Sequence, residues 1–341
     1  MKKFDFVVGN PPFNETVEGR SEEPPIYHFF YDGSISIGNN ITFITPSRFL
    51  FDSGKTPSKW NKKMLNSPHF KILNYEPVGA KVFPTTDIKG GVAITSWDNT
   101  KTFEPIKIFY PHNEIENIVE KVKNITSDFF NTIIFSNTSY KYDKLFYEEN
   151  PDFENRVSGG SRRYLSSSCF KKFPEAFLDN KIDENSIEIV GRKNYKRTSK
   201  YFNKNYLNPP ENFYNYKLVL PSSNGSGIFG ETLSDPFIGK PMEGYTETFV
   251  TFGNFSEFQE ANNSLKYIKT KFARAMLNSK KVTQGNKNSK VWKNVPLQDF
   301  TENSDIDWSK SISEIDQQLY KKYGLSPDEI NFIEEKVQEM E

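Results

Sequence analysis

The tetrapeptide Asn10-Pro11-Pro12-Phe13 contains the residues best suited to chemistry. The exocyclic amine of adenine is a poor nucleophile because its lone pair is delocalised into the ring. An Asn side-chain oxygen and a neighbouring backbone carbonyl can accept its two N–H bonds and draw the nitrogen toward tetrahedral geometry. Two prolines fix φ and remove backbone donors, so the loop is stiff. Phe13 is suited to stack on a base taken out of a duplex.

The residues before this tetrapeptide predict where it lies. Phe4–Gly9 is an apolar run that ends at a glycine, which is typical of a buried parallel strand. In open α/β sheets, ligands bind just beyond the carboxyl ends of such strands. The alternative is an ordinary proline-rich turn without a catalytic role, because Asn-Pro dipeptides also mark turns.

Further elements in the first 112 residues would position this loop. Proline is tolerated in the first turn of a helix, so residues 24–31 should open one. The remaining apolar and β-rich runs predict helices over 47–51 and 59–66 and strands over 40–46, 70–75 and 92–97. Phe83 lies between the last two strands.

This order resembles the second half of the catalytic domain of γ-type N6-adenine DNA methyltransferases, and it is similar to the Eco57I-like restriction–modification methylases. The resemblance implies that Asn10 and the Pro11 carbonyl hold and polarise the adenine amine. It also implies that Phe13 stacks on the flipped base, with Phe83 on its other face; ordinary core packing is the alternative for Phe83. The methyl donor would be S-adenosylmethionine.

The resemblance extends beyond the catalytic segment. Residues 113–298 are similar to the target-recognition domain of the family, with strands expected over 216–221 and 247–252 and a helix over 267–277. The acidic tail, 299–341, predicts two short helices, the first ended by Gly324 and the second started by Ser326. The expected fold class is therefore α/β: half of a Rossmann-like methyltransferase sheet over 1–112, an α+β recognition domain and a helical tail.

Charge is unevenly distributed although the formal net charge is zero. Residues 155–220 hold 13 Lys/Arg against 6 Asp/Glu, residues 263–293 hold 9 Lys/Arg and no acids, and residues 299–341 hold 4 Lys against 12 acids. Two basic windows favour a face that binds double-stranded DNA, although any one cluster can be a solvated surface. The densest basic clusters are Arg162, Arg163, Arg192, Lys193, Lys196, Arg197, Lys280 and Lys281.

Other features limit the possible functions. Cys169 is the only cysteine, and three scattered histidines have no ligand spacing, so no metal site is expected. No signal peptide or stretch of transmembrane length is visible. We therefore expect a cytoplasmic protein that does not enter a membrane.

The elements that would hold S-adenosylmethionine are missing from their expected place. In the γ-type order they precede the catalytic motif, yet nine residues precede Asn10. Gly225–Gly230 matches G-x-G-x-x-G, but Pro236 and turn residues follow where a phosphate-binding helix should begin. We therefore expect a separate or missing N-terminal half to supply the cofactor site, and weak or no cofactor binding by this chain alone.

These observations predict the catalytic-loop and DNA-recognition portion of a site-specific N6-adenine DNA methyltransferase of a restriction–modification system. One alternative is a non-enzymatic DNA sequence-recognition module or inactive fragment. Another is an RNA or protein N-methyltransferase, because Asn-Pro-Pro-aromatic loops also act on those amines. The long basic second region favours DNA.

Overall fold

The computed structural model describes residues 3–15, 23–86, 88–194, 196–223 and 225–340. The chain forms two compact units. Unit 1 comprises 1–116 with 226–229 and 278–283, and unit 2 comprises 117–225, 230–277 and 284–341. The division near 116 lies close to the boundary expected at 112, and the acidic tail is part of unit 2. Helix α3 (Asn113–Ile125) spans the boundary.

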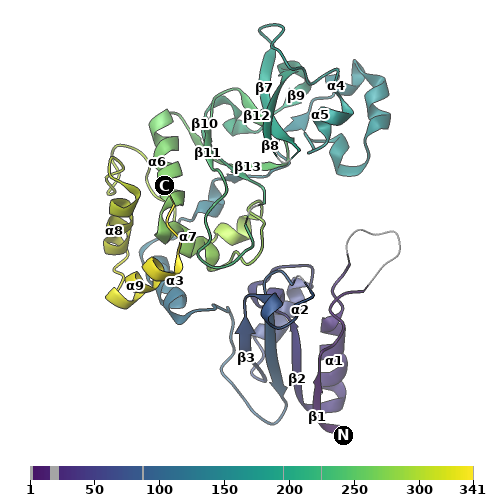
Figure 1. Cartoon of the computed structure of the whole chain (residues 1–341), viewed down its shortest axis with the longest axis vertical. Coiled ribbons are helices and arrows are strands. Elements are labelled where there is room, and N and C mark those ends of the chain that lie inside the picture. The colour runs from purple at the N-terminus through teal and green to yellow at the C-terminus, as the bar shows by residue number, and fades with distance from the viewer. Residues whose placement is uncertain (1–2, 16–22, 87, 195, 224, 341) are drawn as a thin grey trace. The chain divides into compact units, whose positions relative to one another are not determined.

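Unit 1 is built on a four-stranded sheet (Figure 1). Its strands have the order β1-β2-β4-β3; β1 runs parallel to β2, and β4 runs antiparallel to both of its neighbours. The strand bounds are β1 (Phe4–Gly9), β2 (Gly38–Pro46), β3 (Phe70–Glu76) and β4 (Val92–Asp98). All four predicted strands are confirmed.

Two helices enclose an aromatic core in unit 1. They are α1 (Tyr27–Ile37), which packs against β2, and α2 (Ser58–Leu65). Tyr31, Phe49 and Met64 are fully buried between these helices and the sheet. Burying large side chains of this kind contributes about 1.5–3 kcal/mol each, so the unit has a substantial core of its own.

The prediction that Phe4–Gly9 is a buried strand is wrong in one respect. It is a parallel strand, but Phe4, Phe6 and Val8 are 52%, 73% and 77% exposed. The reason is the layering: Val7 packs against the core of unit 1, and successive side chains of a strand point to opposite faces, so Phe4, Phe6 and Val8 lie on the other face of this edge strand. An apolar run therefore did not guarantee burial on both faces.

The described residues of unit 2 form three sheets, of four, three and two strands. Their strand orders are β11-β10-β13-β5, β12-β7-β8 and β6-β9. The strand bounds are β5 (Ile134–Phe135), β6 (Lys141–Tyr142), β7 (Ser186–Lys193), β8 (Lys196–Asn203), β9 (Leu207–Asn208), β10 (Tyr216–Pro221), β11 (Phe237–Gly239), β12 (Glu243–Tyr245) and β13 (Phe249–Phe255). A second, aromatic-rich core that includes Phe146, Phe173 and Phe202 supports this part of the chain.

The helices of unit 2 include one break that the sequence pattern did not predict. Their bounds are α4 (Leu145–Glu148), α5 (Cys169–Lys172), α6 (Phe258–Lys269), α7 (Lys271–Asn278), α8 (Ile312–Lys322) and α9 (Pro327–Lys336). The helix expected over 267–277 is two helices. Thr270 is extended (φ −60°, ψ 148°), and its hydroxyl accepts the Ala273 N–H at 3.1 Å, so it ends α6 and caps α7.

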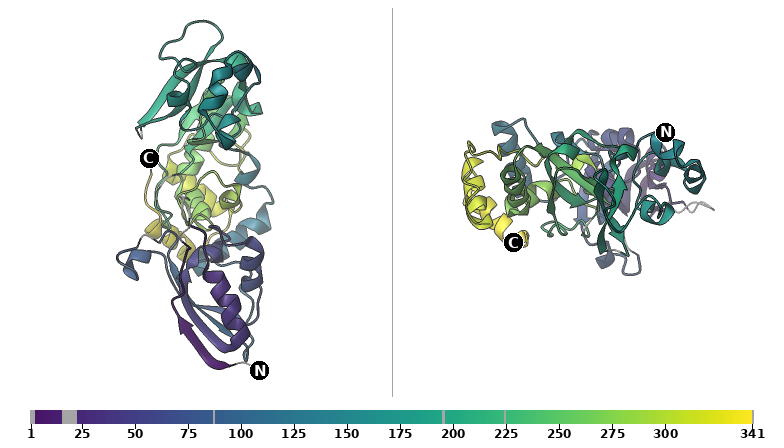
Figure 2. Two further views of the ribbon diagram at one scale, coloured as in Figure 1. Left: turned by 90° about the vertical axis from the view of Figure 1, so that its right-hand side faces the viewer. Right: turned by 90° about the horizontal axis from the view of Figure 1, so that it is seen from above.

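The tail helices follow their predicted signals. Ser311 and Ser326 each accept the N–H of a glutamate three residues on, closing capping boxes at the starts of α8 and α9. Gly324 has φ +61° just after α8, as expected of a glycine that ends a helix. Helix α8 packs against α6 (Figures 1 and 2). In the described part of the chain, every helix is too short or too polar to cross a membrane.

Candidate active site

The Asn-Pro-Pro-Phe loop leaves the carboxyl end of β1, as predicted. Asn10 is exposed, Pro11 is buried and Phe13 is half-buried. The backbone after the prolines is held in place, because the Phe13 carbonyl accepts the Ile26 N–H at 3.0 Å and the Pro24 carbonyl accepts the Glu15 N–H at 2.9 Å. These bonds tie the loop to the chain that enters α1.

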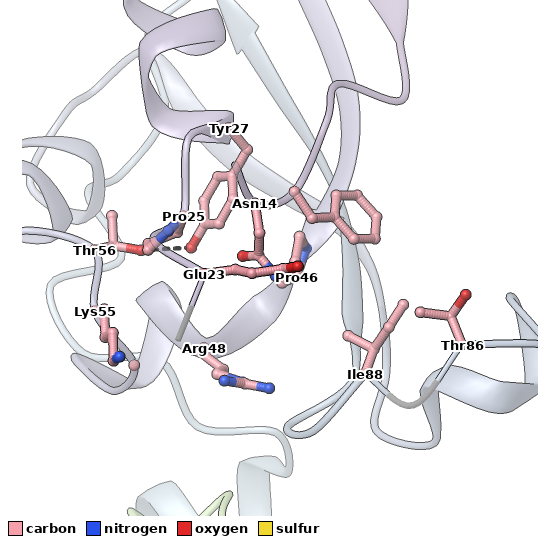
Figure 3. A pocket seen from close by; sticks show the side chains of 12 residues that line it. Asn14, Glu23, Pro25, Tyr27, Pro46, Arg48, Lys55, Thr56, Thr86 and Ile88 are labelled. Carbon is pink, nitrogen blue, oxygen red and sulfur yellow. Dashed lines mark hydrogen bonds between the residues drawn. The ribbon is translucent and has the colours of Figure 1, made fainter. Parts of the chain in front are cut away.

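A cavity of about 300 Å³ opens beside this loop in unit 1 (Figure 3). Phe13 and Asn14 form one part of its wall, and Tyr27, Arg48 and Ile88 form others. The cavity begins at Phe13, because Asn10 and Pro11 are not among its lining residues. Its volume is in the range of small-molecule sites, at roughly 300–1,000 Å³.

Phe13 and Phe83 are brought together, although they do not flank a gap. Their ring centroids lie 5.7 Å apart at an interplanar angle of 82°, an edge-to-face contact. Two rings that sandwich a base must lie parallel and about 7 Å apart, twice the base-stacking distance. A base could enter between them only after one ring turned. The stacking role of Phe83 stays a prediction.

Tyr27 forms a polar part of the cavity wall. Its hydroxyl and the Thr56 hydroxyl are hydrogen-bonded at 2.6 Å (Figure 3). Burial raises the pKa of Tyr27, while the Thr56 hydrogen bond and the positive charge of Arg48 act in the opposite direction. Tyr27 therefore stays a neutral hydrogen-bonding group at physiological pH.

The glycine-rich sequence Gly225–Gly230 does not form a cofactor cradle. No helix follows it; the next regular element is β11, as the sequence indicated. A Cβ at Gly227 would lie 2.5 Å from the Val282 backbone, and one at Gly230 would lie 1.9 Å from the Lys336 carbonyl oxygen. These glycines allow close packing of the chain on itself. The motif therefore does not fit S-adenosylmethionine.

Four of the predicted DNA-binding residues gather at one hairpin tip. Strands β7 and β8 place Arg192 opposite Arg197 and Lys193 opposite Lys196. Like charges directly opposite each other destabilise a β-ladder, so folding alone does not favour this pattern. Arg197 forms an ion pair with Asp235, and its guanidinium lies 4.0 Å from the Phe237 ring centroid. Lys193 and Lys196 are exposed.

The other predicted basic residues lie elsewhere. Arg162 and Arg163 are exposed in unit 2, where Arg162 pairs with Glu154. Lys280 is half-buried in unit 1. Lys281 is 1% exposed, so a contact from its side chain to a DNA phosphate is not compatible with this structure. Two adjacent lysines in a sequence do not reveal which of their side chains is buried.

Comparison with known protein families found a match in the N-terminal part of the chain. Residues 1–83 match the family model described as Eco57I restriction-modification methylase. Residues 1–83 are therefore similar to this family, and we refer to them as the Eco57I-like segment. This Eco57I-like segment begins before Asn10 and extends to Phe83, so it includes every residue that we predicted to touch the base. A search of curated proteins found no match.

Among solved structures, the chain is similar to the type IIG restriction endonuclease BpuSI. The two are 11% identical, with a TM-score of 0.31 over 98% of this chain and 54% of that one. The chain thus spans about half the length of BpuSI.

Proposed function

We propose that this chain is the catalytic-loop and target-recognition portion of an N6-adenine DNA methyltransferase of a restriction–modification system. The observation that carries the proposal is the placement of Asn-Pro-Pro-Phe at the carboxyl end of β1, within the Eco57I-like segment and beside a cavity that begins at Phe13. The carboxyl end of a parallel strand is where such folds bind ligands.

The chemistry assigns a role to three residues of the loop. The Asn10 side-chain oxygen and the Pro11 carbonyl accept the two N–H bonds of the adenine amine, which restores electron density to its nitrogen. Phe13 stacks on the extruded base. No strong base is needed, because the methylated amine is acidic and loses its proton to water. Phe83 supplies a second stacking surface once its ring has turned away from Phe13.

Unit 1 requires a further element for this function. S-adenosylmethionine is the methyl donor that the family uses, and Gly225–Gly230 does not fit it. We place the cofactor site on a separate or missing N-terminal half that packs against β1. This placement is supported by the exposed side chains of Phe4, Phe6 and Val8 on an edge strand, since an exposed apolar edge needs a covering partner.

Unit 2 is proposed to hold the duplex. The tip of the β7–β8 hairpin contributes Lys193 and Lys196 as contacts to phosphate. Arg192 and Arg197 have the planar fork that reads guanine. Arg162 and Arg163 are further phosphate contacts in unit 2. Lys280 is a separate candidate phosphate contact in unit 1, and Lys281 is not included because it is buried.

The test is methyl transfer in a reconstituted system. The chain is co-expressed with the reading frame upstream of it, and methyl transfer from radiolabelled S-adenosylmethionine to duplex DNA is measured, with nucleoside mass spectrometry of the product. N6-methyladenine is expected. DNA binding without any methyl transfer would favour the non-enzymatic recognition module, and transfer only to RNA or protein would favour the other alternative.

A further inference from the structure

Arg48 is a charged residue of the cavity that the sequence pattern did not single out. It lies in the short 3-10 segment Ser47–Phe51, directly after β2, the strand that pairs with β1. Its side chain lines the cavity of unit 1 (Figure 3). Phe13 lines the same cavity. An arginine is always charged under physiological conditions, so the cavity contains a fixed positive charge.

The Arg48 side chain is fixed by its surroundings. Its Nε donates to the Lys89 carbonyl oxygen at 2.5 Å. Its stem lies against two glycines, Gly54 (φ +83°) and Gly90 (φ +84°); a Cβ added at Gly90 would come 3.0 Å from the Arg48 Cγ. Both positions have backbone conformations that favour glycine. The chain thus leaves a channel for this stem and anchors the side chain at Nε, the inner nitrogen of the guanidinium.

Because Nε makes this hydrogen bond, the two terminal nitrogens, Nη1 and Nη2, lie beyond the anchored atom. The two terminal nitrogens form a planar pair of donors, which matches two oxygens of a phosphate. An extruded nucleotide presents both groups that this cavity can hold, because its base is aromatic and its sugar carries phosphate. Lys55 adds a second positive side chain to the wall, while Glu23 adds a carboxylate that can only accept hydrogen bonds.

We propose that Arg48 binds the phosphate of the extruded nucleotide while Phe13 stacks on its base. This inference rests on the proposed function and adds a positioning residue to it. A base swung out of the duplex has many orientations, and a second anchor on its backbone restricts them. Arg48 would thereby hold the amine at Asn10, in the way that bidentate arginine clamps orient other substrates.

The experiment compares small probes that differ by one group. Saturation-transfer NMR titrations of the full chain measure the affinities for deoxyadenosine, for its 5′-monophosphate (dAMP) and for inorganic phosphate. We expect dAMP to bind about tenfold more tightly than deoxyadenosine, the effect of one charge-assisted contact. Inorganic phosphate should bind more weakly than dAMP, since it lacks the base.

Variants assign the difference to Arg48. In Arg48→Gln, which keeps part of the stem, dAMP should bind no better than deoxyadenosine. Arg48→Lys keeps the charge without the fork and should restore part of the difference. Lys59→Gln removes the same charge from an exposed position outside the cavity and should change nothing. Phe13→Ala should lower the affinity for both deoxyadenosine and dAMP. Thermal unfolding of each variant verifies that it is folded.

The outcomes separate the two proposals. If deoxyadenosine and dAMP bind equally to the wild-type chain, or if Arg48→Gln leaves the difference intact, the role of Arg48 is refuted and the function stands. If neither probe binds, or if Phe13→Ala has no effect, the cavity does not hold a nucleotide and the role of Arg48 is refuted, while the function is still decided by methyl transfer in the reconstituted system. Inorganic phosphate binding as tightly as dAMP would also refute the role in positioning a nucleotide.

Discussion

At the scale of single residues, Asn10 makes the strictest demand on the proposed reaction. Its side-chain oxygen must meet a developing positive charge on the adenine nitrogen, whereas the protein contacts DNA through other residues. Asn10 is exposed at the end of β1 and contributes little to the core, so its replacement should leave the fold unchanged.

Asn10→Ala is expected to lower methyl transfer by about 10²–10³-fold in the reconstituted enzyme, the usual loss for a preorganised acceptor or donor at a reacting centre. DNA affinity should change less than twofold. Asn10→Asp keeps an acceptor oxygen at the same place and should retain more activity than the alanine variant. Turnover by Asn10→Ala equal to that of the wild type would refute the assigned role.

Residue-scale prediction succeeded where a short segment carries its own signal. The place of Asn-Pro-Pro-Phe after a strand was predicted correctly from the sequence, whereas its chemistry stays a prediction. Arg48 was missed because its role depends on Gly90, which lies distant in the sequence and shapes the channel for its stem. The residues next to Arg48 in the sequence do not indicate that Gly90 packs against its side chain. Lys281 was misjudged for the same reason.

At the scale of elements, the β7–β8 hairpin should control the salt dependence of DNA binding. Neutralising Lys193 and Lys196 together (Lys→Gln) should reduce the slope of log K against log salt by about 2, because each lost phosphate contact changes it by about 0.9. Fluorescence anisotropy with a duplex oligonucleotide at several salt concentrations measures this slope.

Lys200→Gln is the matched control for the hairpin. Lys200 lies on the same strand, β8, but is already paired with Asp179. Its replacement should leave the slope within error of the wild type. An equal change in slope from Lys200→Gln would mean that general charge, rather than the tip, controls binding.

The junction between α7 and α8 should respond to pH. Asp316 on α8 accepts the backbone N–H groups of Lys271 and Phe272 at 2.9 and 2.8 Å. Burial raises the pKa of Asp316 to about 7, and nearby Glu334 raises it while Arg274 lowers it. The folded state therefore holds a proton that the unfolded state releases near pH 4.

It follows that Asp316 favours folding most at low pH and that this contribution is lost as pH rises from about 4 to 7. Asp316→Asn removes the titration. The free energy of unfolding of the wild type minus that of the variant should fall across this window, as measured by urea unfolding at several pH values. A difference that is flat or rises with pH would contradict the prediction.

At this scale, the sequence predicted where the strands of unit 1 lie but did not predict that β1 is exposed on one face. The strands of unit 1 and the capped tail helices follow from local periodicity and capping residues. The break at Thr270 was missed because the apolar spacing of 267–277 continues through it; a threonine three residues before Ala273 was the available cap signal. The exposure of Phe4, Phe6 and Val8 depends on which face of the sheet the core covers and on the edge position of β1, and local periodicity contains neither.

At the scale of the whole molecule, binding of S-adenosylmethionine tests whether the cofactor site lies in this chain or in a separate half. Calorimetric titration of the purified chain with S-adenosylmethionine should show no binding in the micromolar range, since Gly225–Gly230 is packed against its own chain. The complex with the co-expressed cofactor-binding half should bind S-adenosylmethionine in that range. Micromolar affinity of the chain alone would place the cofactor site within these 341 residues.

The outer strand of unit 1 also has a consequence for handling the protein. Phe4, Phe6 and Val8 present a hydrophobic row next to main-chain groups that any extended peptide can pair with. In storage, the purified polypeptide should therefore self-associate as its concentration rises. Phe6→Lys should reduce this self-association, and it should also weaken docking of the proposed N-terminal half.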